Sequence, residues 1–164
     1  MRIDDILAEI KRRPLVRGNR FRVFFPFRLG TRSANILCSS VTIPRKNIFT
    51  EENRIDRNMW KKPYTYQYED ITMTFHEVNY QLRKDFDAWM NDIVDPLTYT
   101  VAWDSQYRED ITIEALDIQD VASYKVKLIK AFPIAMNDLE LSTENNGLLS
   151  LQITFAFDDV EELN

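Results

Sequence analysis

The sequence contains one cysteine, one histidine and three glycines among its 164 residues. A lone thiol, Cys38, cannot form an internal disulfide, and we expect the protein to be made in a reducing compartment. Nucleophilic catalysis by Cys38 would need a base, and the only imidazole is that of His76. Three glycines cannot build a glycine-rich phosphate-binding loop, which excludes dinucleotide and P-loop sites.

Metal sites and catalytic pairs are also unexpected. His76 stands next to Glu77 in a segment with strand character, so the two side chains would point to opposite faces. The adjacent acidic pairs are more simply solvated charge than catalytic dyads. We therefore predict a protein without enzymatic activity, metal or cofactor. The pairs are Asp4-Asp5, Glu51-Glu52, Asp158-Asp159 and Glu161-Glu162.

Long apolar runs and a basic excess are missing too. No run approaches the ~20 residues of a membrane span, and residues 1–11 are charged where a signal peptide would be apolar. We expect a soluble chain with no membrane insertion. With 26 acidic and 21 basic residues, the net charge of -5 argues against a whole-protein nucleic-acid clamp. The length predicts a single domain over residues 1–164.

What is present is strand alternation near the C-terminus. Within residues 148–157 every second side chain is apolar, which predicts a strand with one face in a core. The segments that contain Ile111 and Ile113, and Val126 and Leu128, alternate in the same way. On the opposite face of each predicted strand the side chains are polar, and they are either small or balanced in charge. Upstream, strands are predicted at residues 21–25 and 34–43, and a short strand at residues 99–103.

Helical spacing occurs twice. Apolar residues recur at positions 82, 86, 89, 90 and 93, which predicts an amphipathic helix that Asn79 caps and that ends before Asp95-Pro96. A shorter stripe in residues 3–10, ended by Pro14, predicts an N-terminal helix that is marginal alone and must dock on this chain's core or on a neighbouring copy.

Residues 45–63 lose all periodicity and carry charges of both signs. A loop of this length is either disordered or functional, and exposed Met59 and Trp60 among charges favour a contact arm. Beyond it, Tyr64, Tyr66 and Tyr68 alternate, and the phase slips before residue 71, which predicts a bulge or a strand that changes sheets. The tyrosines could stack nucleic-acid bases, but without a basic groove a sheet face or subunit contact is favoured.

Short motifs follow one another along nearly the whole chain. They are Asp4-Asp5-Ile6, Asn19-x-Phe21-x-Val23, CSSVTIP from Cys38 to Pro44, YEDITMTF from Tyr68 to Phe75, RKDFDAW from Arg83 to Trp89, Phe132-Pro133 and LQITFAFD from Leu151 to Asp158. Their order resembles that of the tail tube protein of contractile-tailed bacteriophages. Ile71 in YEDITMTF departs from that family, which often has Trp after the Asp of this motif.

The resemblance implies a mainly β protein, an antiparallel β-sandwich or small barrel with a flanking helix and a short N-terminal helix. It implies six copies joined edge to edge into rings, and rings stacked into the inner tube of the virion tail, which conducts DNA into the host. Related tubes occur in type VI secretion and contractile injection systems. The implied partners are further copies of the chain, the sheath, tape-measure, baseplate hub and tail-terminator proteins, and double-stranded DNA in transit, with assembly in the host cytoplasm.

Two sets of site residues follow from this resemblance. A wall that is neutral or acidic would let DNA pass without sticking, and Lys125 and Lys127 are then expected to point away or to be neutralised by Glu114 and Asp117. The predicted lumen residues are Thr112, Glu114, Gln152 and Thr154. The predicted inter-ring contacts are Asp4, Ile6, Leu7, Ile48, Phe49, Arg54, Arg57, Met59, Trp60, Lys61 and Lys62.

Two other functions remain open. One is a tube-initiating or tail-terminating ring of the same machine. The other is a single-strand nucleic-acid binding module that uses the three alternating tyrosines.

Overall fold

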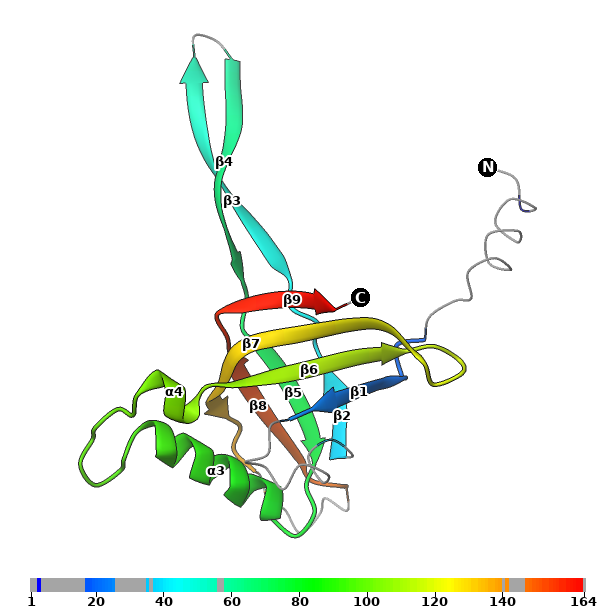
Figure 1. Ribbon diagram of the computed structural model, residues 1–164, viewed down its shortest axis with the longest axis vertical. Helices are drawn as coiled ribbons and strands as arrows, with labels where there is room; N and C mark the ends of the chain where they lie inside the picture. Colours follow the sequence, from blue (N-terminus) through cyan, green and yellow to red (C-terminus); the bar gives the residue numbers. More distant parts are fainter. Residues whose placement is uncertain are drawn as a thin grey trace.

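A computed structural model describes residues 3, 17–25, 35, 37–55, 58–139, 141 and 147–163. Within these residues the chain is mainly antiparallel β-sheet with a flanking helix (Figure 1). The predicted N-terminal helix lies outside the described residues apart from Ile3. The elements are β1 (Phe21–Phe24), β2 (Cys38–Val41), β3 (Lys46–Ile55), β4 (Asn58–Tyr68), β5 (Ile71–His76), α3 (Gln81–Ile93), α4 (Asp104–Tyr107), β6 (Glu109–Leu116), β7 (Ala122–Met136), β8 (Ser150–Ala156) and β9 (Asp159–Leu163).

The long strand β7 joins two layers. Its first part pairs with β6 on one side and β9 on the other, and β1 pairs with β6; we call these strands the β6 layer. Its last residues pair with β8, which pairs with β5 and then β2; we call these the β5 layer. The strands of the two layers cross steeply (Figure 1). Lys130, at φ 55, and a register shift between Pro133 and Ala135 mark the bend.

The core lies between the layers and confirms the predicted alternation. Ile111 and Ile113 of β6 and Leu151, Ile153 and Phe155 of β8 are all buried, as period-two patterning requires. Helix α3 buries one stripe, Leu82, Phe86 and Trp89, in this core. An aromatic cluster joins the helix to both layers, and its members are Phe25, Phe75, Phe86, Trp89 and Phe155.

The predicted cap of α3 is wrong. The residue that precedes the helix is Tyr80, at φ 55, and its side chain makes no capping hydrogen bond. Asn79 is one position too early and is itself left-handed, at φ 60. The turn from β5 into α3 is therefore shaped by backbone conformation at these two residues rather than by a side-chain cap.

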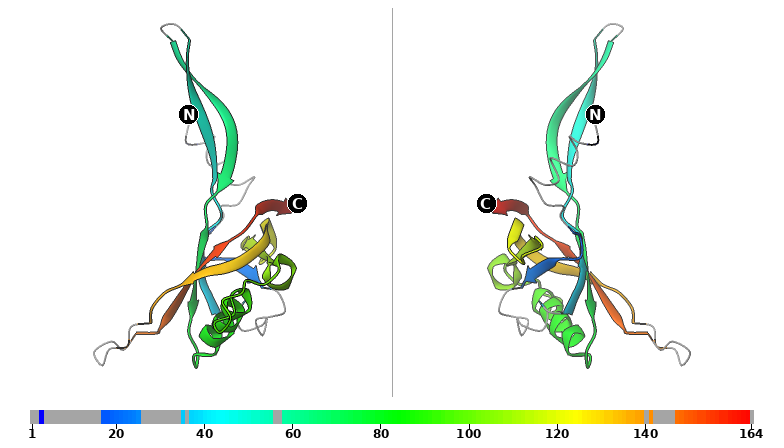
Figure 2. Two further views of the ribbon diagram at one scale, coloured as in Figure 1. Left: turned by 90° about the vertical axis from the view of Figure 1, so that its left-hand side faces the viewer. Right: turned by 90° about the vertical axis from the view of Figure 1, so that its right-hand side faces the viewer.

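The segment at residues 45–63 is not an irregular loop. It belongs to a regular hairpin, β3 with β4, that projects from the body as an arm (Figures 1 and 2). Apolar periodicity is missing because neither face of the hairpin packs on a core, so burial imposes no pattern. The slip before residue 71 is confirmed as a change of sheet, since β4 pairs only with β3 among the described residues and β5 continues into the β5 layer.

Two predicted strands differ from the structure, and one strand was not predicted. Residues 99–103 form no strand, because Tyr99 is left-handed at φ 55 and only an isolated Val94–Val101 bridge forms. Of the strand expected at residues 34–43, the described part is strand only at Cys38–Val41. The unpredicted strand is β9, which main-chain pairing with β7 holds although its side chains are mostly charged.

Candidate assembly surfaces

The arm presents apolar side chains to solvent along its length. Ile48 and Met59 are more than 60% exposed, and Trp60 is 48% exposed. Exposed aromatics and methionine concentrated on one projection are typical of a protein contact surface. The predicted contacts Ile48, Phe49, Met59, Trp60, Lys61 and Lys62 all lie on this arm. Arg54 lies in β3, but its side chain is outside the described set, and so are Asp4, Ile6, Leu7 and Arg57.

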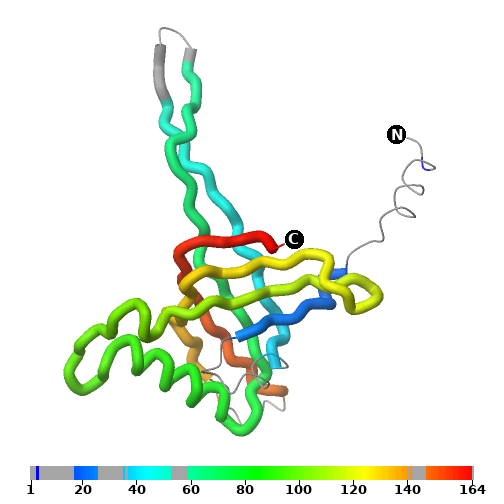
Figure 3. The backbone as a smooth tube through the Cα atoms, in the orientation of Figure 1, coloured from blue at the N-terminus to red at the C-terminus, as the bar shows by residue number. Residues whose placement is uncertain are grey.

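The root of the arm is held in place by aromatic and polar contacts. Lys46 Nζ lies 4.0 Å from the ring centroid of Tyr66, and the Tyr68 ring packs on Phe157 of the body at 6.1 Å. The carboxylate of Glu69 accepts hydrogen bonds from Arg45 and Asn47, both at 2.6 Å, and these bonds lower the pKa of Glu69. The arm therefore leaves the body in a defined direction, as the backbone trace shows (Figure 3).

The outer face of the β5 layer carries no charge. Strands β2, β5 and β8 contain no Asp, Glu, Lys or Arg. Thr72 and Thr74 point away from the core opposite Thr154 and Gln152, and the Thr72 and Thr154 hydroxyls lie 3.4 Å apart. The result is a surface of hydroxyl and amide groups, with the imidazole of His76 in the same phase at the end of β5.

The outer face of the β6 layer is charged and internally paired. Lys125 lies 3.1 Å from Glu114, as expected, whereas Lys127 lies 2.7 Å from Asp110 rather than beside Asp117. The hydrogen bond from Lys127 lowers the pKa of Asp110. Asp117 instead shapes the β6–β7 turn. The charge balance predicted for this hairpin is therefore present, with one partner corrected.

The four predicted lumen residues divide between these two faces. Thr112 and Glu114 lie on the outer face of the β6 layer, and Gln152 and Thr154 lie on that of the β5 layer. Because the core lies between the two faces, the four residues do not share one face of the subunit. The sequence could not show this, since each strand alternates alike and only the tertiary structure assigns it to a layer.

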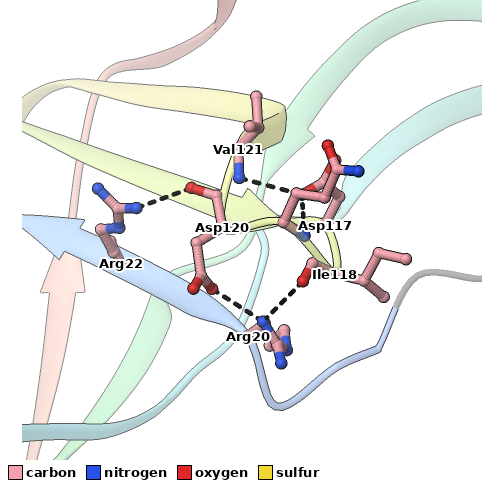
Figure 4. Close-up of polar contacts among 7 residues, drawn as sticks. Arg20, Arg22, Asp117, Ile118, Asp120 and Val121 are labelled. Atoms are coloured by element: carbon pink, nitrogen blue, oxygen red, sulfur yellow. Dashed lines mark hydrogen bonds and ion pairs between the residues drawn. The ribbon is translucent and has the colours of Figure 1, made fainter.

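The β6–β7 turn is pinned to β1 (Figure 4). Asp117 Oδ1 accepts hydrogen bonds from the backbone N–H groups of Gln119 at 2.7 Å and Val121 at 3.0 Å. Arg20 donates to the Asp120 carboxylate, and Arg22 donates to the Asp120 carbonyl, each at 2.9 Å. Sequence reasoning missed these two arginines, because the partners lie about a hundred residues away along the chain.

Several strand edges lack a partner among the described residues. Strand β2 pairs only with β5, and the last five residues of β7 pair only with β8. Strands β1 and β2 do not pair with each other, so the sandwich is open there as a groove of about 520 Å³ whose lining includes Phe21, Val41 and Ile113. Open edges expose unpaired backbone groups that favour pairing with another chain.

Reactive chemistry is scarce in the described part of the chain. Burial raises the pKa of the Cys38 thiol to about 12, so the thiol stays protonated at neutral pH. No cluster of three or more His, Cys, Asp or Glu side chains there is arranged to hold a metal ion. Neither described helix combines the length and apolar character needed to cross a membrane.

The class that these features define is a mainly β protein with a crossed two-layer fold, open strand edges and a projecting arm, all of which leave surfaces available for contact with other chains. The sequence model of the phage tail tube protein family matches residues 17–161, so the chain belongs to that family. No curated protein matches the sequence significantly. The family is a structural one.

Solved structures share the fold. A chain in the extended sheath-tube complex of the PVC extracellular contractile injection system has a TM-score of 0.69 and 19% identity, with 95% of this chain and 96% of that one covered. A chain in the tube-terminating cap of the anti-feeding prophage has a TM-score of 0.70 and 19% identity, with 91% of each covered. A type six secretion system protein has a TM-score of 0.52 and 8% identity, with 87% and 81% covered. These identities show likeness of fold alone.

Proposed function

We propose that the chain forms the inner tail tube of a contractile phage tail, as hexameric rings stacked into a conduit for DNA ejection into the host. The observation that carries this proposal is the β5 layer, which combines two open strand edges with an outer face free of charged residues. Open strand edges expose backbone groups that favour pairing with another chain. A face without Asp, Glu, Lys or Arg suits the wall of a channel through which DNA must pass without binding.

Ring closure follows from the two edges. The free edge of β2 in one copy pairs with the free edge of residues 132–136 of β7 in the next copy. This contact is heterologous, because different surfaces of the two copies meet, and it closes when the rotation between copies divides a full turn. Closure removes the exposed edges that would otherwise promote aggregation.

The outer face of the β5 layer then lines the lumen. Of the predicted wall, Gln152 and Thr154 stay in this proposal, whereas Thr112 and Glu114 move to the exterior with the ion-paired β6 layer. Phosphate contacts repeated at each ring would sum to a large resistance, since each basic contact adds affinity and releases counterions. Hydroxyl and amide groups without positive charge avoid that sum.

The arm supplies the contacts between rings, through Ile48, Phe49, Met59, Trp60, Lys61 and Lys62. The tail sheath would enclose the tube, the tape-measure protein would occupy it before ejection, and the baseplate hub and tail-terminator proteins would bound its ends. Proteins of similar fold come from a sheath-tube complex, a baseplate and a tube terminator, which supports a place in such a machine. Assembly would take place in the host cytoplasm, and the product would be part of the virion.

The nucleic-acid binding alternative is less well supported. Lys46 lies over the ring of Tyr66, and Tyr68 packs against Tyr66 and Phe157, so of the three tyrosines only Tyr64 is free of such contacts with described residues of the arm root and the body, at 65% exposure. Stacking of bases needs open ring faces along a basic groove. A tube-initiating or tail-terminating protein would share this fold. It would form one ring per particle, whereas a tube protein forms many.

Negative-stain electron microscopy of the purified protein tests the proposal. We expect six-fold rings at low concentration and hollow rods at high concentration. Monomers that persist at high concentration, confirmed by light scattering, would contradict it. Rings that never stack would instead favour a terminating ring.

A further inference from the structure

The loop that joins α3 to α4, residues 94–103, carries a second exposed apolar surface. Leu97, Tyr99 and Trp103 are each more than 80% exposed, and Val101 is 68% exposed. The loop projects sideways from the body beside α3 and α4, in the half of the molecule away from the arm (Figure 1). Large apolar side chains gathered in ten residues are typical of an interaction site rather than of scattered surface residues.

The loop is held in one conformation by its own hydrogen bonds. Asp95 Oδ1 accepts a hydrogen bond from Leu97 N at 2.8 Å, and the Asp95 carbonyl accepts one from Tyr99 N at 2.8 Å. At its base, Ala102 N donates to the Ile93 carbonyl at 2.9 Å. A surface ordered in advance loses less conformational entropy when it binds a partner.

Charge distinguishes the region around this loop from the arm. Residues 85–107 contain five aspartates and no lysine or arginine. The arm has the opposite balance, because residues 45–68 contain six basic and three acidic residues, although Lys61 of β4 lies 3.5 Å from Glu52 of β3. Both surfaces also display aromatic side chains, Tyr99 and Trp103 on the loop and Trp60 and Tyr64 on the arm. Opposite charge steers two surfaces together, and their apolar groups then contribute the buried area.

We propose that the loop at residues 94–103 of one copy receives strand β4 of the arm of a second copy in the adjacent ring. The inference rests on the proposed stacking of rings, and it identifies the surface that the arm contacts in the adjacent ring. Complementary surfaces on different parts of one molecule produce a heterologous contact, which repeats along an axis when the rotation between copies does not close a ring. The occupant is thus another copy of this chain and not the sheath.

The first test removes the apolar surface without touching the bonds that hold the loop. Leu97→Ser with Trp103→Ser should leave the subunit folded and able to form rings, because both side chains are exposed. It should raise the concentration needed for tubes by about tenfold or more. Ile118→Ser, which also removes an exposed apolar side chain but on the β6–β7 turn, is the control and should leave that concentration unchanged.

The second test is a cross-link in a Cys38→Ser background. One protein carries Leu97→Cys, and the other carries a single cysteine substitution of Met59, Lys61 or Tyr64. Oxidation of mixed assemblies should give a disulfide dimer between the two proteins for at least one arm position. The same oxidation below the assembly concentration should give none.

The outcomes separate this inference from the function on which it rests. Tubes that form at the wild-type concentration in the Leu97→Ser, Trp103→Ser variant overturn the inference and leave the tube function intact, even if sheath binding is lost. Tubes that form without any mixed disulfide at the three arm positions do the same. A wild-type chain that forms neither rings nor tubes overturns both.

Discussion

At the residue scale, two tryptophans show how environment decides the role of a side chain. Trp89 is 2% exposed, and its Nε1–H donates to the Tyr107 carbonyl at 2.8 Å, which ties α3 to α4. Trp103 is 81% exposed on the loop between the same two helices. The first belongs to the aromatic core and the second to the proposed contact surface.

Trp89→Phe should destabilise the subunit by about 2–3 kcal/mol, because it leaves a buried carbonyl unpaired and a small void. Trp103→Phe should change stability by no more than about 0.5 kcal/mol. Urea denaturation of both variants, at protein concentrations below assembly, measures the difference. Equal effects would show that the Tyr107 hydrogen bond contributes nothing.

The thiol of Cys38 offers a pH test. Burial raises its pKa to about 12, and the thiolate is the reactive species, so alkylation of the folded protein should be slow at pH 8 and accelerate as pH rises toward 12. The urea-unfolded chain should react at pH 8 at the rate of an ordinary cysteine. Equal rates for folded and unfolded protein at pH 8 would contradict the burial.

Arg108 owes its role to residues that are distant in the sequence. Its guanidinium bonds to the Asp158 carboxylate, lies 3.4 Å from Asp104 and covers the Phe132 ring at 5.0 Å. These contacts join α4 to the corner where β8 turns into β9. Nothing in the local sequence marks Arg108 as different from other surface arginines.

At the element scale, the arm is an extension of the fold that the body does not need. All described side chains between Ile48 and Gln67 are exposed, so the arm contributes little to the core. Its pairing is regular on both sides of a register shift between Phe49 and Thr50. The arm can therefore be shortened at a paired position without disturbing the body.

Replacing residues 50–64 with Asn-Gly would join Phe49 to Thr65, which are paired, through a two-residue turn. The shortened subunit should keep its melting temperature within a few degrees and its rings, and it should lose tubes. Calorimetry and electron microscopy check the two expectations. Tubes of normal length from this variant would show that stacking uses another surface.

At the scale of the whole molecule, the bend in β7 gives one chain two outer faces of different character. The β6 layer carries the ion pairs Lys125–Glu114 and Lys127–Asp110, and strands β2, β5 and β8 of the β5 layer contain no Asp, Glu, Lys or Arg. A tube needs two such faces, because the interior must not bind its cargo while the exterior meets other proteins.

A single positive charge on each face tests which one is interior. Tubes of Gln152→Lys, assembled with short linear duplex DNA, should retain DNA that nuclease cannot reach and that high salt releases. Wild-type tubes and tubes of Thr112→Lys should protect none, since the second charge lies on the other layer. DNA protected by Thr112→Lys and not by Gln152→Lys would exchange the assignment of the faces.

The amino-acid sequence alone determined the elements whose pattern comes from burial. Alternation in β6 and β8 and helical spacing in α3 were predicted correctly, because each buries one face against a core and must therefore be apolar at a fixed period. The paired regularity of the arm and the existence of β9 were not predictable in this way. Their backbones are held by strand pairing, which leaves the side chains free to be charged.

Only the tertiary structure decided which strands share a face. Thr112 and Thr154 read alike in the sequence, since each is a polar position between buried neighbours. The bend of β7 sends them to opposite sides of the core, and the same bend leaves β2 and the end of β7 as open edges. Strand alternation specifies which side chains of a strand are buried and which are exposed. The path of the chain specifies whether the exposed side chains lie on the outer face of the β6 layer or on that of the β5 layer.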